Sequence, residues 1–500
     1  MLLMAAVVAG LACASTAQFD ARSFGAVGDG ETDDSRAFQA AIDEAFVAGG
    51  GEVFVPGSEA GYRLARPILV RPNVTLRGFH AGPADAHFLA EHDAGNPEPF
   101  VPVAGGVLIA QNEYPAVTLA HNSGIAGLTF AYPDQVPYTP MPIKPYPPLL
   151  QVRGFGPGEN VPGIHRDERI AADGSISGRS VSIRDIGAIN AYHILDMAGA
   201  NPPTQQVAQI TVDGLWGYPL SVGINIQNSL DTIFLRNIQL RPTFFHDACG
   251  EISRTSIGLA LGKTDGCAIT DLLVFGLGIG VLHRCADGSL EAFSVRVSNA
   301  NVEAMLPVWF DSHAVDDQVQ YVNSFLFHTE FGFRRTETDV YSREGHDLFP
   351  DIRFTPDDLC VVRVSNRRDE STFQSYARFV GCGFHAKNSG PICRVEGNQL
   401  VRVMLASSHM VYFRDSVLDV AEGAKVLATI TGNDIMCWGS LDLSVGRVDA
   451  EHAHLIDFTR ADPSCNAIFS SNMIHGARPE LVDELAEMPK VVAEGNLLAQ

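Results

Sequence analysis

One short phrase returns along most of this chain: an apolar strand, a polar turn residue, then another apolar strand. It is clear as VSIRDIGAI around Asp185 and as ITVDGLW around Asp213. Further occurrences are centred on Asn237, Asp271, Asn299, Asn323, Cys382, Ser408, Asn433 and Asn472. Most steps are about 24 to 28 residues long, and periods of roughly 20 to 50 residues are typical of stacked repeat architectures.

This period restricts the fold to a narrow class. Three short strands and three turns fit a unit of this length, which corresponds to one coil of a solenoid. A single coil cannot bury its apolar face, so neighbouring coils have to stack. Strands do not alternate steadily with long helices, which argues against a doubly wound fold. We therefore predict an all-β, single-chain, right-handed parallel β-helix.

The turn residues of the phrase are predicted to form one column when the coils are stacked. The members of this column are Asp185, Asp213, Asn237, Asp271, Asn299 and Asn323. Side chains of Asp and Asn hydrogen-bond to nearby backbone groups in turns, and a stack of them forms a ladder. We interpret these carboxylates as structural, so catalytic carboxylates have to be sought outside the column.

The segment 24–56 predicts a loop, a helix, a glycine stop and a buried strand, in that order. Apolar residues between Ala37 and Phe46 recur at helical spacing, and Gly49 to Gly51 end the helix. A helix laid over the open end of a stacked sheet would cover unpaired strand edges. We interpret the acidic residues Asp29, Asp33 and Asp34 as loop and cap residues.

The same segment resembles the opening of the pectate-lyase-like superfamily of right-handed parallel β-helix proteins, many of which act on polysaccharides. The resemblance is strong over residues 19–80 and continues more generally through the repeat. Other phrases resemble proteins related to family 28 glycoside hydrolases: Tyr132-Pro133-Asp134-Gln135, Pro145-Tyr146-Pro147 and Gly262-Lys263-Thr264-Asp265. The resemblance implies a carbohydrate-active protein and leaves its reaction open.

The first 17 residues resemble a secretory signal, with an apolar run followed by small residues. We expect residues 18–500 to form one β-helix domain with loop insertions near 132–179 and 330–358. The mature protein is then secreted, periplasmic or on the cell surface. Eight cysteines remain after removal of the leader, an even number compatible with disulfides. Cys437 and Cys465 could pair across neighbouring coils or stay as free thiols.

The charge balance narrows the class of partner. The formal net charge of -23 argues against nucleic acid and against an anionic membrane surface. No stretch beyond the leader reaches the roughly 18 to 20 apolar residues of a membrane span. We expect a polysaccharide or oligosaccharide as the partner, and a homotrimer stays open.

The resemblance leaves three functions open. A glycoside hydrolase, our leading expectation, would place carboxylates on adjacent coils about 4.8 Å apart. The motifs Asn-Thr-Asp, Gly-His-Gly and Arg-Ile-Lys of polygalacturonases are absent from this chain, which argues against a pectinase. A polysaccharide lyase acting by β-elimination is the second expectation, and a non-catalytic carbohydrate-binding or adhesive β-helix is the third.

Polar residues outside the column are the candidate site residues. We predict Asp247, Asp265 and Asp311 as catalytic acids and bases. The predicted substrate-binding residues are Tyr132, Tyr146, His246, Lys263 and His313. The two tyrosines belong to a Pro- and Tyr-rich insertion that is expected to expose aromatic faces to sugar rings. No spacing resembles a metal site, and no cofactor is expected, except Ca²⁺ if the protein is a lyase.

Overall fold

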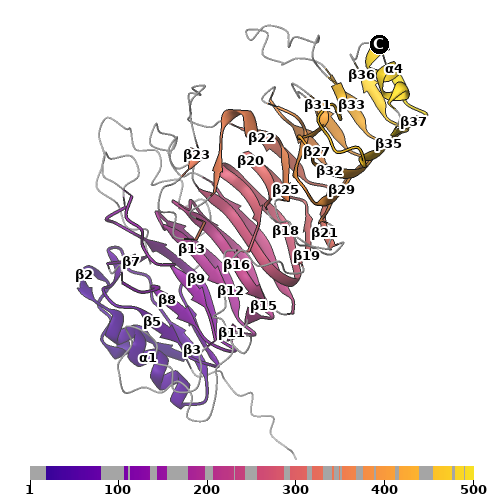
Figure 1. Ribbon diagram of the computed structural model, residues 1–500. Helices are drawn as coiled ribbons and strands as arrows, with labels where there is room; N and C mark the ends of the chain where they lie inside the picture. Colours follow the sequence, from indigo (N-terminus) through magenta and orange to yellow (C-terminus); the bar gives the residue numbers. More distant parts are fainter. Residues whose placement is uncertain are drawn as a thin grey trace, which may run out of the picture.

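The computed structural model shows an elongated solenoid of short parallel strands (Figure 1). Its strands join into one hydrogen-bonded array of 36 strands, which confirms the predicted β-helix. The predicted leader lies outside the described residues. The structure describes residues 18–79, 106–110, 113–135, 143–154, 178–197, 207–229, 231–241, 256–285, 293–311, 318–329, 341–342, 348–349, 352–366, 375–387, 390–411, 416–437, 454–475, 479–488 and 490–499.

Each coil contributes a strand to three parallel sheets that run along the solenoid. Sheet 1 consists of β5 (Ile68–Val70), β8 (Val117–Leu119), β10 (Leu150–Val152), β13 (His193–Met197), β16 (Val222–Ser229), two passes of β18 (Ile257–His283), β20 (Asn301–Asp311), β25 (Val362–Asn366), β28 (Cys393–Gly397), β31 (Ser416–Val420) and β34 (His454–Asp457).

Sheet 2 consists of β1 (Gln18–Asp20), β3 (Gly51–Phe54), β6 (Val74–Arg77), β9 (Gly124–Ala131), β12 (Ser182–Ile189), β15 (Ile210–Gly217), β17 (Ile233–Leu240), β18, β19 (Phe293–Ser298), β21 (Gln318–Val322), β26 (Ser375–Val380), β29 (Leu400–Ala406), β32 (Lys425–Thr431), β35 (Asn466–Ser470) and β37 (Val491–Glu494). The short strands β11 (Gly178–Arg179) and β14 (Val207–Ala208) pair beside it.

Sheet 3 takes the second halves of β9, β12, β15 and β17 and parts of β18 and β20. Its other strands are β2 (Asp29–Asp33), β4 (Gly61–Leu64), β7 (Val107–Ile109), β22 (Phe325–His328), β27 (Gly383–His385), β30 (His409–Val411), β33 (Asp434–Met436), β36 (Met473–His475) and β38 (Leu497–Ala499).

From Gly127 onwards, the corner between sheets 2 and 3 is made by one residue per coil in the left-handed backbone region. Its φ lies between 48° and 81° in Gly127, Asp185, Gly214, Asn237, Asp271, Asn299, Asn323, Gly381, Ser407, Gly432, Ser471 and Gly495. Strand register places these residues in one column, called the corner column below. Gly, Asn and Asp tolerate this conformation best, which explains the residue types found there.

The structure confirms the predicted column at five of its six positions and corrects the sixth. Asp213 lies one residue before the corner, which Gly214 occupies. The ladder contact is still made, because Asn237 Nδ2 donates to Asp213 Oδ1 at 2.6 Å. Farther along, Cys382, Ser408 and the later phrase centres lie one residue after the corner and are buried.

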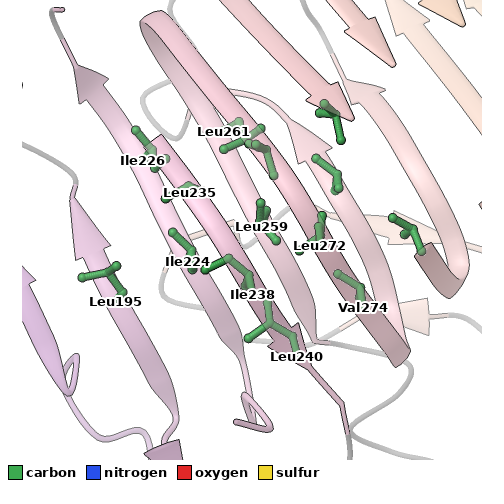
Figure 2. Close-up of a cluster of buried hydrophobic side chains, with 14 of the residues drawn as sticks. Leu195, Ile224, Ile226, Leu235, Ile238, Leu240, Leu259, Leu261, Leu272 and Val274 are labelled. Carbon is green, nitrogen blue, oxygen red and sulfur yellow. The ribbon is translucent and has the colours of Figure 1, made fainter. Parts of the chain in front are cut away.

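The interior of the solenoid is filled by apolar side chains stacked coil on coil. Leu195, Ile224 and Leu259 are register partners on successive strands of sheet 1, and all three are buried. Figure 2 shows this stack beside the neighbouring pair Ile238 and Leu272. Because side chains alternate along a strand, the residues directly before and after each of these core residues face outward.

Towards the C-terminal end, the interior position after the corner column becomes polar. Asn433 donates through Nδ2 to Asn472 Oδ1 at 3.0 Å, and Asn472 donates to Asn496 Oδ1 at 3.1 Å. Each of these acceptor oxygens also receives the backbone N–H of the preceding asparagine. The ladder therefore satisfies buried backbone donors at the corner, a requirement for burying them at low cost.

The N-terminal helix α1 (Ser35–Val47) forms as predicted and contacts the first strands of sheets 1 and 2 (Figure 1). Its face from Ala37 to Ala45 is buried, whereas Phe46 is partly exposed under Arg71. Asp33 accepts hydrogen bonds from Ser35 at the helix start. Asp34 instead accepts from the loop amides of Val27 and Gly28. Asp33 therefore caps the start of the helix, and Asp34 fixes the preceding loop.

The remaining elements are short. The segments η1 (Ala21–Phe24) and η3 (Pro356–Asp358) are 3₁₀ helices, β23 (Tyr341–Ser342) and β24 (Arg353–Phe354) form an antiparallel pair, and α4 (Pro479–Glu487) contacts β34 and β37. Within the described residues, no helix is long and apolar enough to cross a membrane.

The open alternative for Cys437 and Cys465 is resolved in favour of free thiols. Cys465 Sγ lies instead at the backbone of the neighbouring coil, where it contacts Val426 N and Ala424 O. Burial raises the pKa of the Cys437 thiol to about 12. Both side chains belong to the apolar packing of the solenoid, Cys465 within it and Cys437 at its margin.

We predict that Asn472→Ala lowers the free energy of unfolding by about 1–3 kcal/mol, because it removes an acceptor from a buried amide and a buried N–H. Thermal and urea unfolding would measure the loss. Asn466→Ala is the matched control, since this exposed asparagine only donates to Ser464 O. Equal losses in the two variants would contradict the role of the ladder.

The corner column generates a second prediction. Asn299 is exposed and has a φ of 53°. Asn299→Gly should leave stability unchanged or slightly higher, whereas Asn299→Val should cost about 1–2 kcal/mol, because a β-branched side chain clashes in the left-handed region. Unfolding midpoints of the two variants measure the difference. A valine variant as stable as the glycine variant would refute the steric explanation.

Candidate functional site

The predicted site residues are scattered over the structure. Asp247, His246 and His313 lie outside the described residues. Asp265 is exposed next to Gly266, at the corner where β18 passes from sheet 1 to sheet 2. Lys263 is half-buried near the same corner.

Asp311 lies elsewhere, on the outer face of sheet 1. Gly262, Arg284 and Asp311 are register partners on three successive strands of sheet 1, so two strand spacings separate Gly262 from Asp311. Asp265 is three residues beyond Gly262 along β18. Spacings of about 4.8 Å across strands and about 3.3 Å along them place the two backbones more than about 10 Å apart. The structure therefore does not bring Asp265 and Asp311 together as a facing pair.

The predicted aromatic platform is not formed by the two tyrosines assigned to it. Tyr132 and Tyr146 are buried and pack edge to face, with ring centroids 4.8 Å apart. Burial raises the pKa of both phenols above the usual value. Their prediction as substrate-binding residues is corrected, because the rings belong to the apolar packing that anchors the start of the insertion.

A continuous set of polar side chains lies on the outer face of sheet 1. Asp196 is at its centre: Gln151 Nε2 donates to Asp196 Oδ2 at 3.2 Å, and Asn225 Nδ2 donates to Asp196 Oδ1 at 2.9 Å. Gln227 Nε2 in turn donates to Asn225 Oδ1 at 2.8 Å. We call Gln151, Asp196, Asn225 and Gln227 the acid–amide row.

Strand register explains how the acid–amide row is built. Gln151, Asp196 and Asn225 are register partners on β10, β13 and β16, and their strand neighbours Leu195 and Ile224 face the core. The residue that would crowd the row from the next coil is a glycine. A Cβ at Gly262 would lie 2.2 Å from Gln227 Oε1, so Gly262 leaves the room in which this side chain lies.

The row was not predicted from the sequence, although a signal exists. The triplets Leu150-Gln151-Val152, Leu195-Asp196-Met197 and Ile224-Asn225-Ile226 all read apolar, polar, apolar. Aligning the coils on their inward residues would have placed the middle residues side by side. The turn phrase marks the corner between sheets 2 and 3, so an alignment on this phrase does not reveal the row on sheet 1.

Cations accompany this face. Arg153 directly follows β10, and Lys263 on β18 is the register partner of Asn228 on β16. Farther along, Arg284 Nη1 lies 2.8 Å from Asp311 Oδ2, with both side chains largely buried. Asp311 is therefore one half of a buried ion pair, which is a structural arrangement and leaves its predicted catalytic role without geometric support.

The middle of the sheet 1 outer face is covered. Leu282 and Trp309 form a second apolar cluster with Phe349 and Phe354, which belong to the predicted insertion near 330–358. The ring of Trp309 also lies under the guanidinium of Arg363, at 4.7 Å. The described part of this insertion therefore covers the outer face of sheet 1 in the middle of the solenoid. The acid–amide row lies on the N-terminal side of this covered region.

Beyond the cover, sheet 1 carries a buried ion network. Arg363 is 3% exposed and contacts Asp358 at 3.1 Å and Glu396 at 3.0 Å, while Arg394 pairs with Asp419 at 2.7 Å. These charges neutralise one another within the protein and resemble structural pairs. Among the described residues, no group of at least three His, Cys, Asp or Glu could hold a metal ion.

The acid–amide row thus combines one fixed carboxylate with several amides. Carboxylates and amides accept and donate hydrogen bonds to hydroxyl groups, and a positioned carboxylate can also transfer protons. The accessible part of the row consists of the half-buried Gln151, Asp196 and Gln227, because Thr118 before Gln151 and Ala260 after Asn225 are buried.

The N-terminal part of the chain is similar in sequence to known proteins. Residues 18–90 match the family described as rhamnogalacturonase A/epimerase, pectate lyase-like. A stretch of 49 residues is 55% identical to mannuronan C5-epimerase AlgE1 of Azotobacter vinelandii, covering 10% of this chain and 3% of the epimerase. Another of 72 residues is 40% identical to alginate lyase 7 of the same organism, covering 13% of this chain and 8% of the lyase.

The chain therefore spans only a small part of these curated relatives.

Among solved structures, the A-module of mannuronan C-5 epimerase AlgE6 of Azotobacter vinelandii is similar with a TM-score of 0.42 and 14% identity, covering 96% of this chain and 99% of that chain. A GH87 α-1,3-glucanase catalytic unit from Streptomyces thermodiastaticus is similar with a TM-score of 0.44 and 12% identity, covering 97% and 69%.

The buried pair on sheet 1 gives a testable prediction. Arg284→Met leaves the carboxylate of Asp311 buried without its cation, and we expect it to cost about 3–5 kcal/mol of unfolding free energy. Arg284→Met combined with Asp311→Leu should recover most of that loss. The matched control is Arg236→Met, which breaks the more exposed pair with Asp213 and should cost less than about 1 kcal/mol. Equal losses in the two single variants would contradict the buried-pair assignment.

Proposed function

We propose that this member of the pectate-lyase-like superfamily of parallel β-helix proteins is a carbohydrate-active enzyme that modifies an acidic polysaccharide. The proposed substrate class is a polyuronate, and the proposed first step is removal of the C5 proton of a uronate residue. Elimination and epimerisation share this step, so the proposal covers both outcomes. The similarity of short stretches to mannuronan epimerases and to an alginate lyase supports this chemistry.

The observation that carries the proposal is the fixed carboxylate of Asp196. Side-chain amides hold both of its oxygens, so its position on the sheet is defined before a ligand arrives. Such preorganisation is what a proton-transfer group or a sugar-hydroxyl acceptor requires. The half-buried amides of Gln151 and Gln227 would hydrogen-bond to hydroxyls of neighbouring sugar rings, while the buried Asn225 holds Asp196 in place.

The C5 proton of a uronate lies next to a carboxylate, so its removal builds negative charge on that group. Cationic side chains beside the carboxylate lower the barrier by stabilising this charge. Arg153, two residues beyond Gln151 at the end of β10, is the residue proposed for this role. Lys263 is not assigned it, because two strand spacings and three residues separate it from Asp196. A polyuronate supplies the carboxylate that a cation at this position can pair with, which is why the acidic class is favoured.

Glycoside hydrolysis, the leading expectation from the sequence, is here the second candidate. It is supported by Asp311 and Glu396, which share one register line on sheet 1 with Ser365 between them. Two strand spacings separate their backbone positions by about 9.6 Å, just above the range of about 6.5 to 9.5 Å between the carboxylates of inverting glycosidases. Both carboxylates are engaged by arginines, however. The hydrolytic arrangement is therefore the less favoured of the two.

The test compares Asp196→Asn with the parent on polymannuronate and polygalacturonate. We expect at least a roughly 100-fold loss of rate, the scale of an acid–base contribution. Ultraviolet absorbance reports elimination, proton NMR reports inversion at C5, and reducing-end assays report all chain cleavage. Asp213→Asn is the matched control, since Asp213 lies beside the corner column on another sheet, and its rate should equal that of the parent.

Two results would sink the proposal. One is an Asp196→Asn variant with the parent rate on a substrate that the parent modifies. The other is the formation of reducing ends without a new chromophore and without solvent exchange at C5, which would identify the hydrolytic candidate.

A further inference from the structure

Sheet 2 has a charge pattern that the acid–amide row does not explain. Its strands β19, β21, β26, β29, β32 and β35 contain no Asp or Glu, in a chain whose formal net charge is -23. The same strands contain Arg296, Arg378, Arg402 and Lys425. Figure 1 shows β19, β21, β29, β32 and β35 following one another along one side of the solenoid.

The arginines of this face lack the carboxylate partners that most described arginines have. Ion pairs bind Arg66, Arg71, Arg77, Arg179, Arg236, Arg284, Arg363, Arg394 and Arg460 to carboxylates. Within the described part of the chain, Arg296, Arg378 and Arg402 form no such pair. Arg296 and Arg402 are exposed. An acidic protein that keeps unpaired arginines together leaves a local surface that attracts anions.

An aromatic side chain completes the arrangement. The guanidinium of Arg378 lies over the ring of Tyr376 at 4.7 Å, and Arg402 is the register partner of Tyr376 on the next strand. Arg296 lies two strands away in the line that passes through Gln320 to Arg378. Parallel strands are about 4.8 Å apart, so these groups form a cationic line along the solenoid.

The line runs into a hollow. A cavity of about 390 Å³ lies over β32, β35 and β37, lined by Leu427, Thr429, Ile468, Lys490 and Val492 among others. Leu427 is the register partner of Arg402, so the hollow adjoins the arginines directly. We call Arg296, Tyr376, Arg378, Arg402 and this hollow the arginine face.

We propose that the arginine face is a second binding surface, separate from the acid–amide row, for an extended anionic polysaccharide. Arginines pair with carboxylates and sulfates, while the ring of Tyr376 and the apolar lining of the hollow offer surface to the apolar faces of sugar rings. Charges repeated from coil to coil suit a ligand whose charges also repeat. Such a surface would hold a polymer while another segment of it occupies the acid–amide row, which increases the effective concentration there.

The inference is argued from the charges of sheet 2 and does not require the proposed reaction to be correct. Nucleic acid is the other extended polyanion. The surrounding negative charge of the protein disfavours a ligand as densely charged as DNA, so the polysaccharide is the ligand proposed.

The experiment measures binding of fluorescently labelled polygalacturonate and polymannuronate by the full chain, at low and at raised ionic strength. The double variant Arg296→Gln/Arg402→Gln should raise the dissociation constant about tenfold, a change equivalent to about 1.4 kcal/mol. The control double variant Arg36→Gln/Arg66→Gln removes the same charge at helix α1 and should stay within about twofold of the parent. All four arginines are at least partly exposed, so both variants are expected to fold, which circular dichroism verifies.

Further arms separate this inference from the proposed function. Asp196→Asn should retain the salt-sensitive binding that Arg296→Gln/Arg402→Gln loses, and the arginine variant should retain the parent rate on short oligouronates. Unchanged polyuronate binding in the arginine variant would overturn the inference, even if Asp196 proves catalytic. Equal binding of single-stranded DNA, or of neutral dextran, would also overturn it, because the face would then not select an anionic polysaccharide.

Discussion

Backbone register between parallel coils is the constraint on which the rest of the structure depends. Each strand hydrogen-bonds to the equivalent strand of the next coil, and from Gly127 onwards one residue in the left-handed region turns each coil at the same corner. The corner column keeps the alternation of inward and outward side chains in phase from coil to coil. A slip of one residue would exchange the two faces of a strand, so apolar stacks inside and polar rows outside have a common origin.

The repeat could be predicted because turn chemistry is local: Asn and Asp tolerate the left-handed region, and they mark the corner wherever they occur. The shift at Asp213 shows the limit, since a glycine one residue later takes the corner and residue type alone cannot reveal this. The acid–amide row could not be found in the same way. Asp196 acquires its partners only when coils distant in sequence stack, and the alignment that reveals them follows the inward residues.

The burial of Tyr132 and Asp311 has a related cause. Aromatic density and an isolated carboxylate are both compatible with an exposed site and with a packed interior. Neighbours decide between these outcomes: Tyr146 for the tyrosine and Arg284 for the aspartate. The outer surface is thereby divided in charge. Sheet 1 holds a fixed carboxylate with amides and then balanced ion pairs, whereas a long part of sheet 2 carries cations without carboxylates.

A crystal structure of the Asp196→Asn variant with a bound oligouronate tests the central claim most directly. Our account predicts a sugar ring over the acid–amide row on the outer face of sheet 1, with hydroxyls at Gln151 or Gln227 and the uronate carboxylate turned towards Arg153. An oligouronate bound only elsewhere, with the acid–amide row occupied by solvent, would contradict it.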